Sequence, residues 1–159
     1  MSGNIEKRKE HVVPPRKDRL AVVLDTNVIV GRFLSRGRPS ANLRVYNLWS
    51  MERRLQLVVS PPIIDEYLET LERVIDEPQL IAPFRARLQD SPTVTRINLG
   101  KRFRFSRDPD DDILLATAHT GHARYLVTND RDLIEIPAKD RRGFRFEIVK
   151  PAQLLQTFF

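Results

Sequence analysis

The chain contains no cysteine and only three histidines among its 159 residues. Without cysteine there can be no disulfide framework, no zinc site with cysteine ligands and no thiol nucleophile. No apolar run approaches the roughly 18–20 residues that a membrane-spanning helix needs, and residues 1–19 lack the hydrophobic stretch of a secretory signal. We therefore expect a cytoplasmic protein with no membrane association, of a length that suits one domain.

The charge of the chain is basic, with 27 lysine and arginine residues against 21 acidic ones and a formal net charge of +6. Of the basic residues, 21 are arginine, whose planar guanidinium suits bidentate contacts with phosphate. Residues 1–19 hold six basic and three acidic side chains, and we interpret them as a flexible basic tail before a single domain over 20–159. This composition is compatible with a nucleic-acid partner.

Short apolar segments alternate with longer amphipathic ones from residue 20 onward. Five segments have the composition of strands: 20–24, 55–59, 93–99, 125–128 and 144–149. Helical spacing of apolar residues places helices between them, at 40–52, 61–75, 78–88 and 111–120, with a short helical turn at 131–135. Strands separated by helices predict an α/β fold, a three-layer α/β/α sandwich around a mainly parallel sheet of about five strands.

Acidic side chains follow these strands, at the edge of a parallel sheet where ligands usually bind. Asp25 ends the first strand, Glu66 lies early in the helix after the second, and Asp112 stands where another apolar helix begins. Asp130 follows the strand at 125–128. Each one alone is explained as a helix cap or a turn residue, but four carboxylates at one edge repel each other unless a cation neutralises them. Because oxygen ligands suit hard cations, the four predict a Mg²⁺ site that Mn²⁺ could also fill.

The same segments resemble the successive motifs of PIN-domain nucleases, most closely the toxins of toxin–antitoxin pairs related to VapC. The matching segments are 22–27, 60–66, 108–116 and 126–133, and the similarity extends over about residues 20–155. The resemblance implies an acidic catalytic quartet of Asp25, Glu66, Asp112 and Asp130, in which all but Glu66 hold the metal and Glu66 is a ligand or a water-orienting base. It assigns supporting roles to Asn27, Thr128, Asp111 and Asp132.

The implied reaction is metal-dependent hydrolysis of RNA that leaves 5′-phosphate and 3′-hydroxyl ends. A small antitoxin is the expected protein partner, and a homodimer is expected because PIN domains commonly pair. Exposed apolar groups could form the dimer interface or could equally belong to the core: Trp49, Leu154, Phe158 and Phe159. Two arginine groups are candidate RNA contacts, the first in an expected loop with Gly31 and Gly37 and the second ahead of Asp108: Arg32, Arg36 and Arg38, and Arg102, Arg104 and Arg107.

Three other functions stay open at this point. A non-catalytic nucleic-acid-binding PIN domain and a structure-specific DNA nuclease would use the same fold, and a small-molecule phosphohydrolase is a more distant alternative. The charge distribution favours a nuclease, because eight of the acids gather near the proposed metal: Asp25, Glu66, Asp108, Asp110, Asp111, Asp112, Asp130 and Asp132. The rest of the chain then holds 27 basic residues against 13 acidic ones, a basic shell around an acidic pocket.

Overall fold

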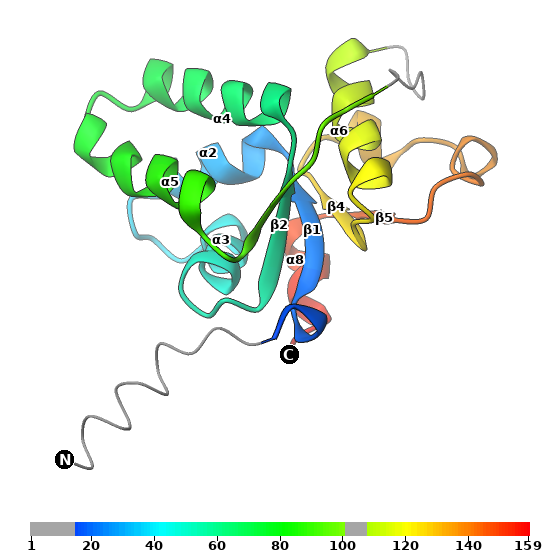
Figure 1. Ribbon diagram of the computed structural model, residues 1–159, viewed down its shortest axis with the longest axis horizontal. Helices are drawn as coiled ribbons and strands as arrows, with labels where there is room; N and C mark the ends of the chain where they lie inside the picture. The colour runs from blue at the N-terminus through cyan, green and yellow to red at the C-terminus, as the bar shows by residue number, and fades with distance from the viewer. Residues whose placement is uncertain (1–14, 101–107) are drawn as a thin grey trace.

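A central parallel sheet organises the computed structural model, which describes residues 15–100 and 108–159 (Figure 1). Its strands within these residues are β1 (Leu20–Leu24), β2 (Leu55–Val59), β3 (Val94–Arg96), β4 (Tyr125–Val127) and β5 (Glu147–Val149). They are arranged in the order β3-β2-β1-β4-β5, and every neighbouring pair is parallel. The predicted α/β class with a sheet of about five strands is therefore confirmed.

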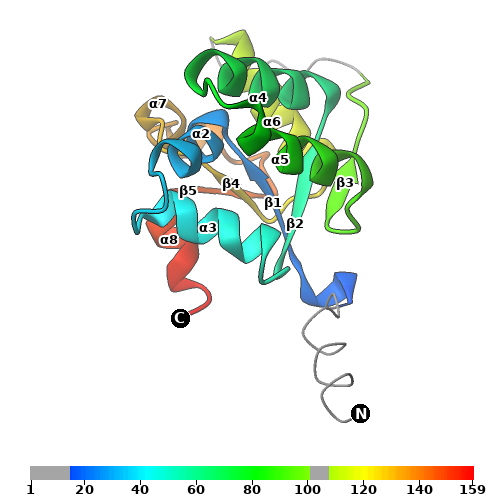
Figure 2. The same cartoon turned by 90° about the vertical axis from the view of Figure 1, so that its left-hand side faces the viewer.

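Helices cover both faces of this sheet. They are α2 (Thr26–Leu34), α3 (Ala41–Ser50), α4 (Pro61–Val74), α5 (Pro78–Asp90), α6 (Pro109–Thr120), α7 (Arg131–Ile134) and α8 (Pro151–Gln156), with the short 3-10 helices η1 (Arg16–Asp18) and η2 (Ala138–Asp140). Helix α6 packs on β1, β2 and β4 from one side, while α2, α3, α4 and α5 lie on the other side of β1 and β2 (Figure 1). Helix α3 also packs against α8 (Figure 2). No helix in the described ranges is long and apolar enough to cross a membrane.

The element boundaries follow local sequence signals closely. Four helices, α4, α5, α6 and α8, begin with proline in the first turn, where the missing N–H costs no hydrogen bond. The strands predicted at 93–99 and 144–149 are shorter than expected, since they span only Val94–Arg96 and Glu147–Val149. Hydrogen bonds to β2 continue for one residue on each side of β3, at Thr93 and Ile97.

Helix α2 corrects the prediction of a loop around Gly31. Gly31 lies inside this helix, and a Cβ atom built on it would stand 2.2 Å from Nδ2 of Asn42, so a larger residue would force the Asn42 side chain to move. Gly37 is the true turn residue, with a φ of +82° in the left-handed region that favours glycine. The sequence pattern could not distinguish a glycine that makes room for a neighbouring helix from one that makes a turn.

An aromatic cluster fills the space between the sheet and helices α2 to α5. Its members are in edge-to-face or tilted contact, with ring centroids 5.4 to 6.0 Å apart: Phe33, Tyr46, Trp49, Tyr67 and Phe84. Trp49 and Leu154 are fully buried in the core, so these two take no part in an exposed interface. Phe158 packs partly against the core, whereas Phe159 is 72% exposed.

Candidate functional site

The carboxyl edge of the sheet is where the starts of α2, α4 and α6 come together (Figure 1). Aspartates cap α6 and α7, because a carboxylate at an N-cap accepts hydrogen bonds from free backbone N–H groups of the first turn. Asp108 caps α6 by accepting from the N–H of Asp110 at 2.9 Å, and Asp130 caps α7 by accepting from the N–H of Asp132 at 2.9 Å. Asp25 also occupies a cap position, but its side chain makes no capping bond and is directed elsewhere.

Asp25 is the most enclosed carboxylate of this edge. Its side chain is 8% exposed, and Oδ2 accepts hydrogen bonds from Oγ1 of Thr128 at 2.7 Å and from Nδ2 of Asn27 at 3.1 Å. Burial raises the pKa of Asp25; the hydrogen bonds from Thr128, the backbone of Thr26 and Asn27 act against this, and the charge of Asp130 adds to it. Asn27 and Thr128, for which the resemblance implies supporting roles, thus both contact Asp25, and those roles stay a prediction.

Glu66 lies across from Asp25, on the first turns of α4. Burial raises its pKa most, and the charge of Asp25 raises it further. Asp110 and Asp108, at the start of α6, also contribute to the increase. The hydroxyl of Thr26 acts in the opposite direction, although it makes no hydrogen bond of normal geometry within the described residues. Glu66 therefore faces both the end of β1 and the start of α6.

Asp111 has the largest number of acidic neighbours among these groups. Burial raises its pKa to about 6, together with the charges of Asp108, Asp130, Asp25 and Asp132. These neighbours belong to three different motifs of the sequence, so the tertiary structure brings Asp111 within electrostatic reach of all three motifs. Asp112, which the resemblance placed in the quartet, lies next to Asp111 in the first turn of α6.

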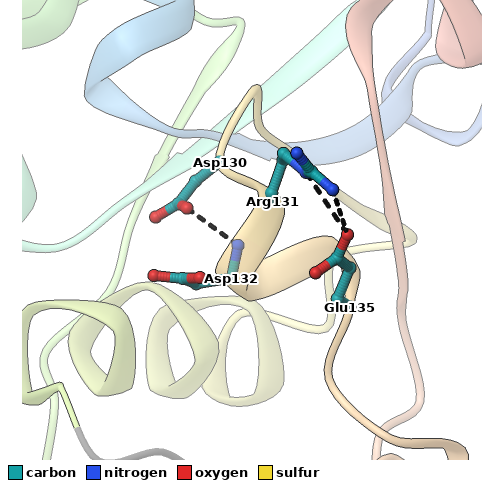
Figure 3. Close-up of polar contacts among 4 residues, drawn as sticks. All are labelled: Asp130, Arg131, Asp132 and Glu135. Atoms are coloured by element: carbon teal, nitrogen blue, oxygen red, sulfur yellow. Dashed lines mark hydrogen bonds and ion pairs between the residues drawn. The ribbon is translucent and has the colours of Figure 1, made fainter.

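The start of α7 carries two aspartates on one side and an ion pair on the other (Figure 3). The carboxylates of Asp130 and Asp132 point to one side of the turn, while Arg131 lies on the other side and pairs with Glu135 at 3.1 Å. The backbone N–H of Asp130 is held by Oγ1 of Thr128 at 2.9 Å, which connects this turn to Asp25 through one hydroxyl. Arg131 thus pairs with Glu135 and does not neutralise the carboxylates of Asp130 and Asp132.

The predicted RNA-binding arginines lie in three different situations. Arg32 belongs to α2 and not to a mobile loop, and its guanidinium stacks over the rings of Phe33 at 4.3 Å and Tyr46 at 4.7 Å. Arg36 and Arg38 are exposed in the segment that follows α2. The other three lie outside the described residues: Arg102, Arg104 and Arg107.

Two asparagines beside the site were missed by the sequence reasoning. Asn129 donates from Nδ2 to Oδ1 of Asn42 at 3.0 Å and to Oδ1 of Asn27 at 3.3 Å. Asn129 stands between two residues that the motif did identify, Thr128 and Asp130, and this position was an available signal. Asn42 has no such signal, because it lies far along the chain from every acidic motif.

The ligand chemistry and charge of this edge fit a divalent cation. Its side chains are carboxylates, which are the oxygen ligands that hard cations prefer. Burial raises the pKa values of Asp25, Glu66 and Asp111, and neighbouring carboxylates raise them further. Within the described ranges no three acidic or histidine side chains converge closely enough to bind one ion together. Binding of an ion would therefore have to draw the carboxylates closer to one another.

Comparisons with solved structures support the fold. The chain superimposes on a structure of VapBC2 from Rickettsia felis bound to a DNA fragment from its promoter, with a TM-score of 0.52 and 14% sequence identity, covering 82% of this chain and 98% of that one. PAE2754 from Pyrobaculum aerophilum gives a TM-score of 0.52 and 16% identity over 87% of this chain and 88% of that one. At these identities the likeness concerns the fold alone.

Sequence comparison identifies the family. No curated protein matches the chain. The family model of the PIN domain, however, matches residues 21–132, which extend from β1 into α7 and include each motif that contributes a carboxylate to the acidic edge. The chain therefore belongs to the PIN-domain family, whose members are nucleases.

Proposed function

We propose that this protein is a Mg²⁺-dependent endoribonuclease that acts as the toxin of a toxin–antitoxin pair. One observation carries the proposal: carboxylates from four separate motifs lie within electrostatic reach of one another at one sheet edge. The charge of Asp130 contributes to the raised pKa values of Asp25 and Asp111, and the charge of Asp25 contributes to the raised pKa of Glu66. Membership of the PIN-domain family supports hydrolysis of nucleic acid. PIN nucleases generally use a divalent metal ion, and we propose Mg²⁺ here, with Mn²⁺ as a substitute.

The metal ligands in this proposal are Asp25, Asp130 and one carboxylate at the start of α6. The sequence pattern favours Asp112 for this third position, whereas the charges around Asp111 support Asp111, which we therefore propose as the ligand. Asp132 adds negative charge beside it. A bound divalent ion would lower the pKa of its water and stabilise charge on the phosphoryl oxygens.

The protein groups around the ion have separate tasks. Thr128 and Asn27 hold Oδ2 of Asp25 in one orientation through their hydrogen bonds. Glu66 has a raised pKa and lies opposite Asp25, so its carboxylate suits acceptance of a proton from the attacking water. The exposed Arg36 and Arg38 are placed after α2 in a segment that can contact the phosphates of single-stranded RNA.

The toxin assignment rests on the fold neighbour that contains VapBC2 together with DNA from its promoter. A toxin of this type is neutralised by a small partner protein, so we propose an antitoxin partner in addition to an RNA substrate and a homodimer. Expression of the chain should arrest growth, and co-expression with a small protein encoded by the neighbouring gene should restore it. Growth arrest that the neighbouring gene does not relieve would contradict the toxin–antitoxin assignment.

Replacement of Asp25 by Asn tests the reaction directly. The change keeps the size of the side chain and an oxygen for Thr128, but it removes the charge that a metal needs. We expect cleavage of single-stranded RNA in Mg²⁺ to fall by more than about 100-fold, while circular dichroism shows a folded protein. The matched control is Asp65→Asn, because Asp65 is an exposed carboxylate on α4 next to Glu66.

The same assay separates the alternatives. Single-stranded RNA, single-stranded DNA and a flap substrate are offered in parallel to the wild-type protein. Preferred cleavage of the DNA substrates would contradict the endoribonuclease assignment and favour a structure-specific DNA nuclease. Salt-sensitive binding without turnover, in Mg²⁺ and in Mn²⁺, would leave a non-catalytic nucleic-acid-binding domain.

A further inference from the structure

Three asparagine amides form a continuous hydrogen-bonded chain beside Asp25. They come from three places in the fold: Asn27 in α2, Asn129 in the connection between β4 and α7, and Asn42 in the first turn of α3. We propose that Asn42 is a positioning residue for the acidic site, which acts through Asn129 and Asn27 on the carboxylate of Asp25. This inference rests on the proposed metal-dependent function and adds α3, a helix without any acidic motif, to the machinery of the site.

The direction of each hydrogen bond in the chain is determined by one backbone group. The N–H of Asn129 can only donate, and it donates to Oδ1 of Asn27 at 3.2 Å. Oδ1 of Asn27 must therefore face Asn129, which turns Nδ2 of Asn27 toward Oδ2 of Asp25 at 3.1 Å. An inverted Asn27 amide would put two oxygens against each other at Asp25 and two donors against each other at Asn129.

The side chain of Asn129 joins the two other amides. Its Nδ2 donates to Oδ1 of Asn27 at 3.3 Å and to Oδ1 of Asn42 at 3.0 Å. Because the same nitrogen serves both acceptors, the place of Asn42 determines where the Asn129 amide lies, and this in turn supports the orientation of Asn27. Loss of the Asn42 oxygen leaves Asn129 with one acceptor and greater rotational freedom.

Asn42 is itself held in place by the backbone of α2. A Cβ atom on Gly31 would lie 2.2 Å from Nδ2 and 2.9 Å from Cγ of Asn42, so the amide rests directly on the glycine. The chain of contacts therefore starts on α2 at Gly31 and returns to α2 at Asn27, passing through α3 and the turn before α7. Such a closed path resists movement of Asn27 more than a single hydrogen bond does, because each end is attached to the same rigid helix.

Binding of Mn²⁺ alone, measured by calorimetry on the full chain, tests this inference without a substrate. We expect Asn42→Ala to weaken Mn²⁺ binding by about 10-fold, the lower end of the effect of groups that orient metal ligands. Asn129→Ala, an exposed change that cannot unfold the core, should cause a similar loss because it removes both side-chain links. Asn42→Asp keeps an oxygen for Asn129 and should retain affinity within about threefold of the wild type.

The contact with Gly31 gives an independent test. Gly31→Ala should displace the amide of Asn42 and weaken Mn²⁺ binding about as much as Asn42→Ala. In the Asn42→Ala background the same glycine change should add little, since the amide that it displaces is already absent. Additive losses in the double variant would overturn the proposed route.

A control amide is available at the opposite edge of the sheet. Gln56 on β2 accepts from Nε of Arg19 at 2.7 Å and donates to Oγ1 of Thr95 at 2.9 Å, so Gln56→Met breaks a comparable amide contact. It should lower the Tm and leave Mn²⁺ affinity unchanged. The inference is overturned if Asn42→Ala and Asn129→Ala bind Mn²⁺ like the wild type, or if Gln56→Met weakens binding equally. Absence of Mn²⁺ binding by the wild type would instead refute the proposed metal-dependent function.

Discussion

The aromatic cluster and the acidic edge are built from the same helices but obey opposite physical rules. Helix α2 begins beside Asp25 and carries Phe33 in its last turn, and α4 carries Glu66 and Tyr67 in adjacent positions. Tyr67 is fully buried, contacts Phe84, and donates its hydroxyl to the carbonyl of Leu24. One residue further along the chain, Asp25 lies among groups of its own charge.

The two regions contribute to stability with opposite sign: the aromatic cluster stabilises the fold and the acidic edge destabilises it. In the aromatic cluster, apolar surface leaves water and ring edges meet ring faces, and both effects stabilise the folded state. At the acidic edge, burial and like charges raise the pKa of Asp25, Glu66 and Asp111, which means that their ionised forms are disfavoured by folding. Proteins retain such local cost where a ligand later relieves it.

Removal of the ring at the centre of the cluster should have the largest effect on stability. Phe84 is 1% exposed and contacts four other rings, so Phe84→Ala should lower the free energy of unfolding by about 3–5 kcal/mol, measured with urea. Phe159→Ala is the control, because Phe159 is 72% exposed and should change stability by less than about 0.5 kcal/mol. At a temperature where Phe84→Ala stays folded, Mn²⁺ affinity should be retained; its loss would show that the two regions are coupled.

Loss of one hydroxyl should have a smaller effect, confined to the acidic edge. Thr128→Val removes the donor to Oδ2 of Asp25 and the acceptor of the Asp130 N–H while it preserves the shape of the buried side chain. We expect Mn²⁺ to bind about 10- to 100-fold more weakly. Thr128→Ser restores the hydroxyl and should recover most of the affinity. Equal affinities for the valine and serine variants would contradict the role of this hydroxyl.

Neutralisation of Asp111 should have the smallest effect and the opposite sign. The pKa of Asp111 is raised from 3.8 to about 6 in the folded protein. The ionised carboxylate therefore lowers the free energy of unfolding in full above pH 6, and this destabilisation disappears below pH 3.8, where the carboxyl is neutral in both states. Because Asp111 is only partly buried, solvent screening reduces the effect of this shift on stability to about 1 kcal/mol. In EDTA at pH 7.5, Asp111→Asn should therefore raise the Tm by about 2–4 °C.

Two measurements sharpen this prediction. The gain in Tm should shrink as the pH falls from 6 toward 4, because the wild-type carboxyl then becomes neutral as well. Asp112→Asn is the comparison variant, because it removes one carboxylate from the same first turn of α6. A larger increase in Tm for Asp112→Asn than for Asp111→Asn would favour Asp112 as the third metal ligand.

Local signals in the sequence predicted most elements because those signals act over a few residues. The apolar run at 20–24 indicates β1, and the prolines at the first positions of α4 and α5 indicate where these helices begin. Neither signal depends on the rest of the chain. Helix α2 was not predicted, because a glycine in the sequence suggests a turn. Only the structure shows that Gly31 lies in a helix and packs against Asn42. The carboxylates at Asp25 and Asp130 could be placed at one edge from strand order, since parallel strands end together.

The sequence by itself determined the α/β class, the acidic motifs and the segments in which they stand, because hydrophobic period and capping chemistry are properties of neighbouring residues. Only the tertiary structure decided that the charges of Asp25 and Asp130 act on Asp111, that Arg32 stacks on Tyr46, and that Asn42 reaches the site. The physical reason is that the direction of a side chain depends on how its helix is rotated against the sheet. That rotation is determined by packing between distant segments, which a local pattern does not contain.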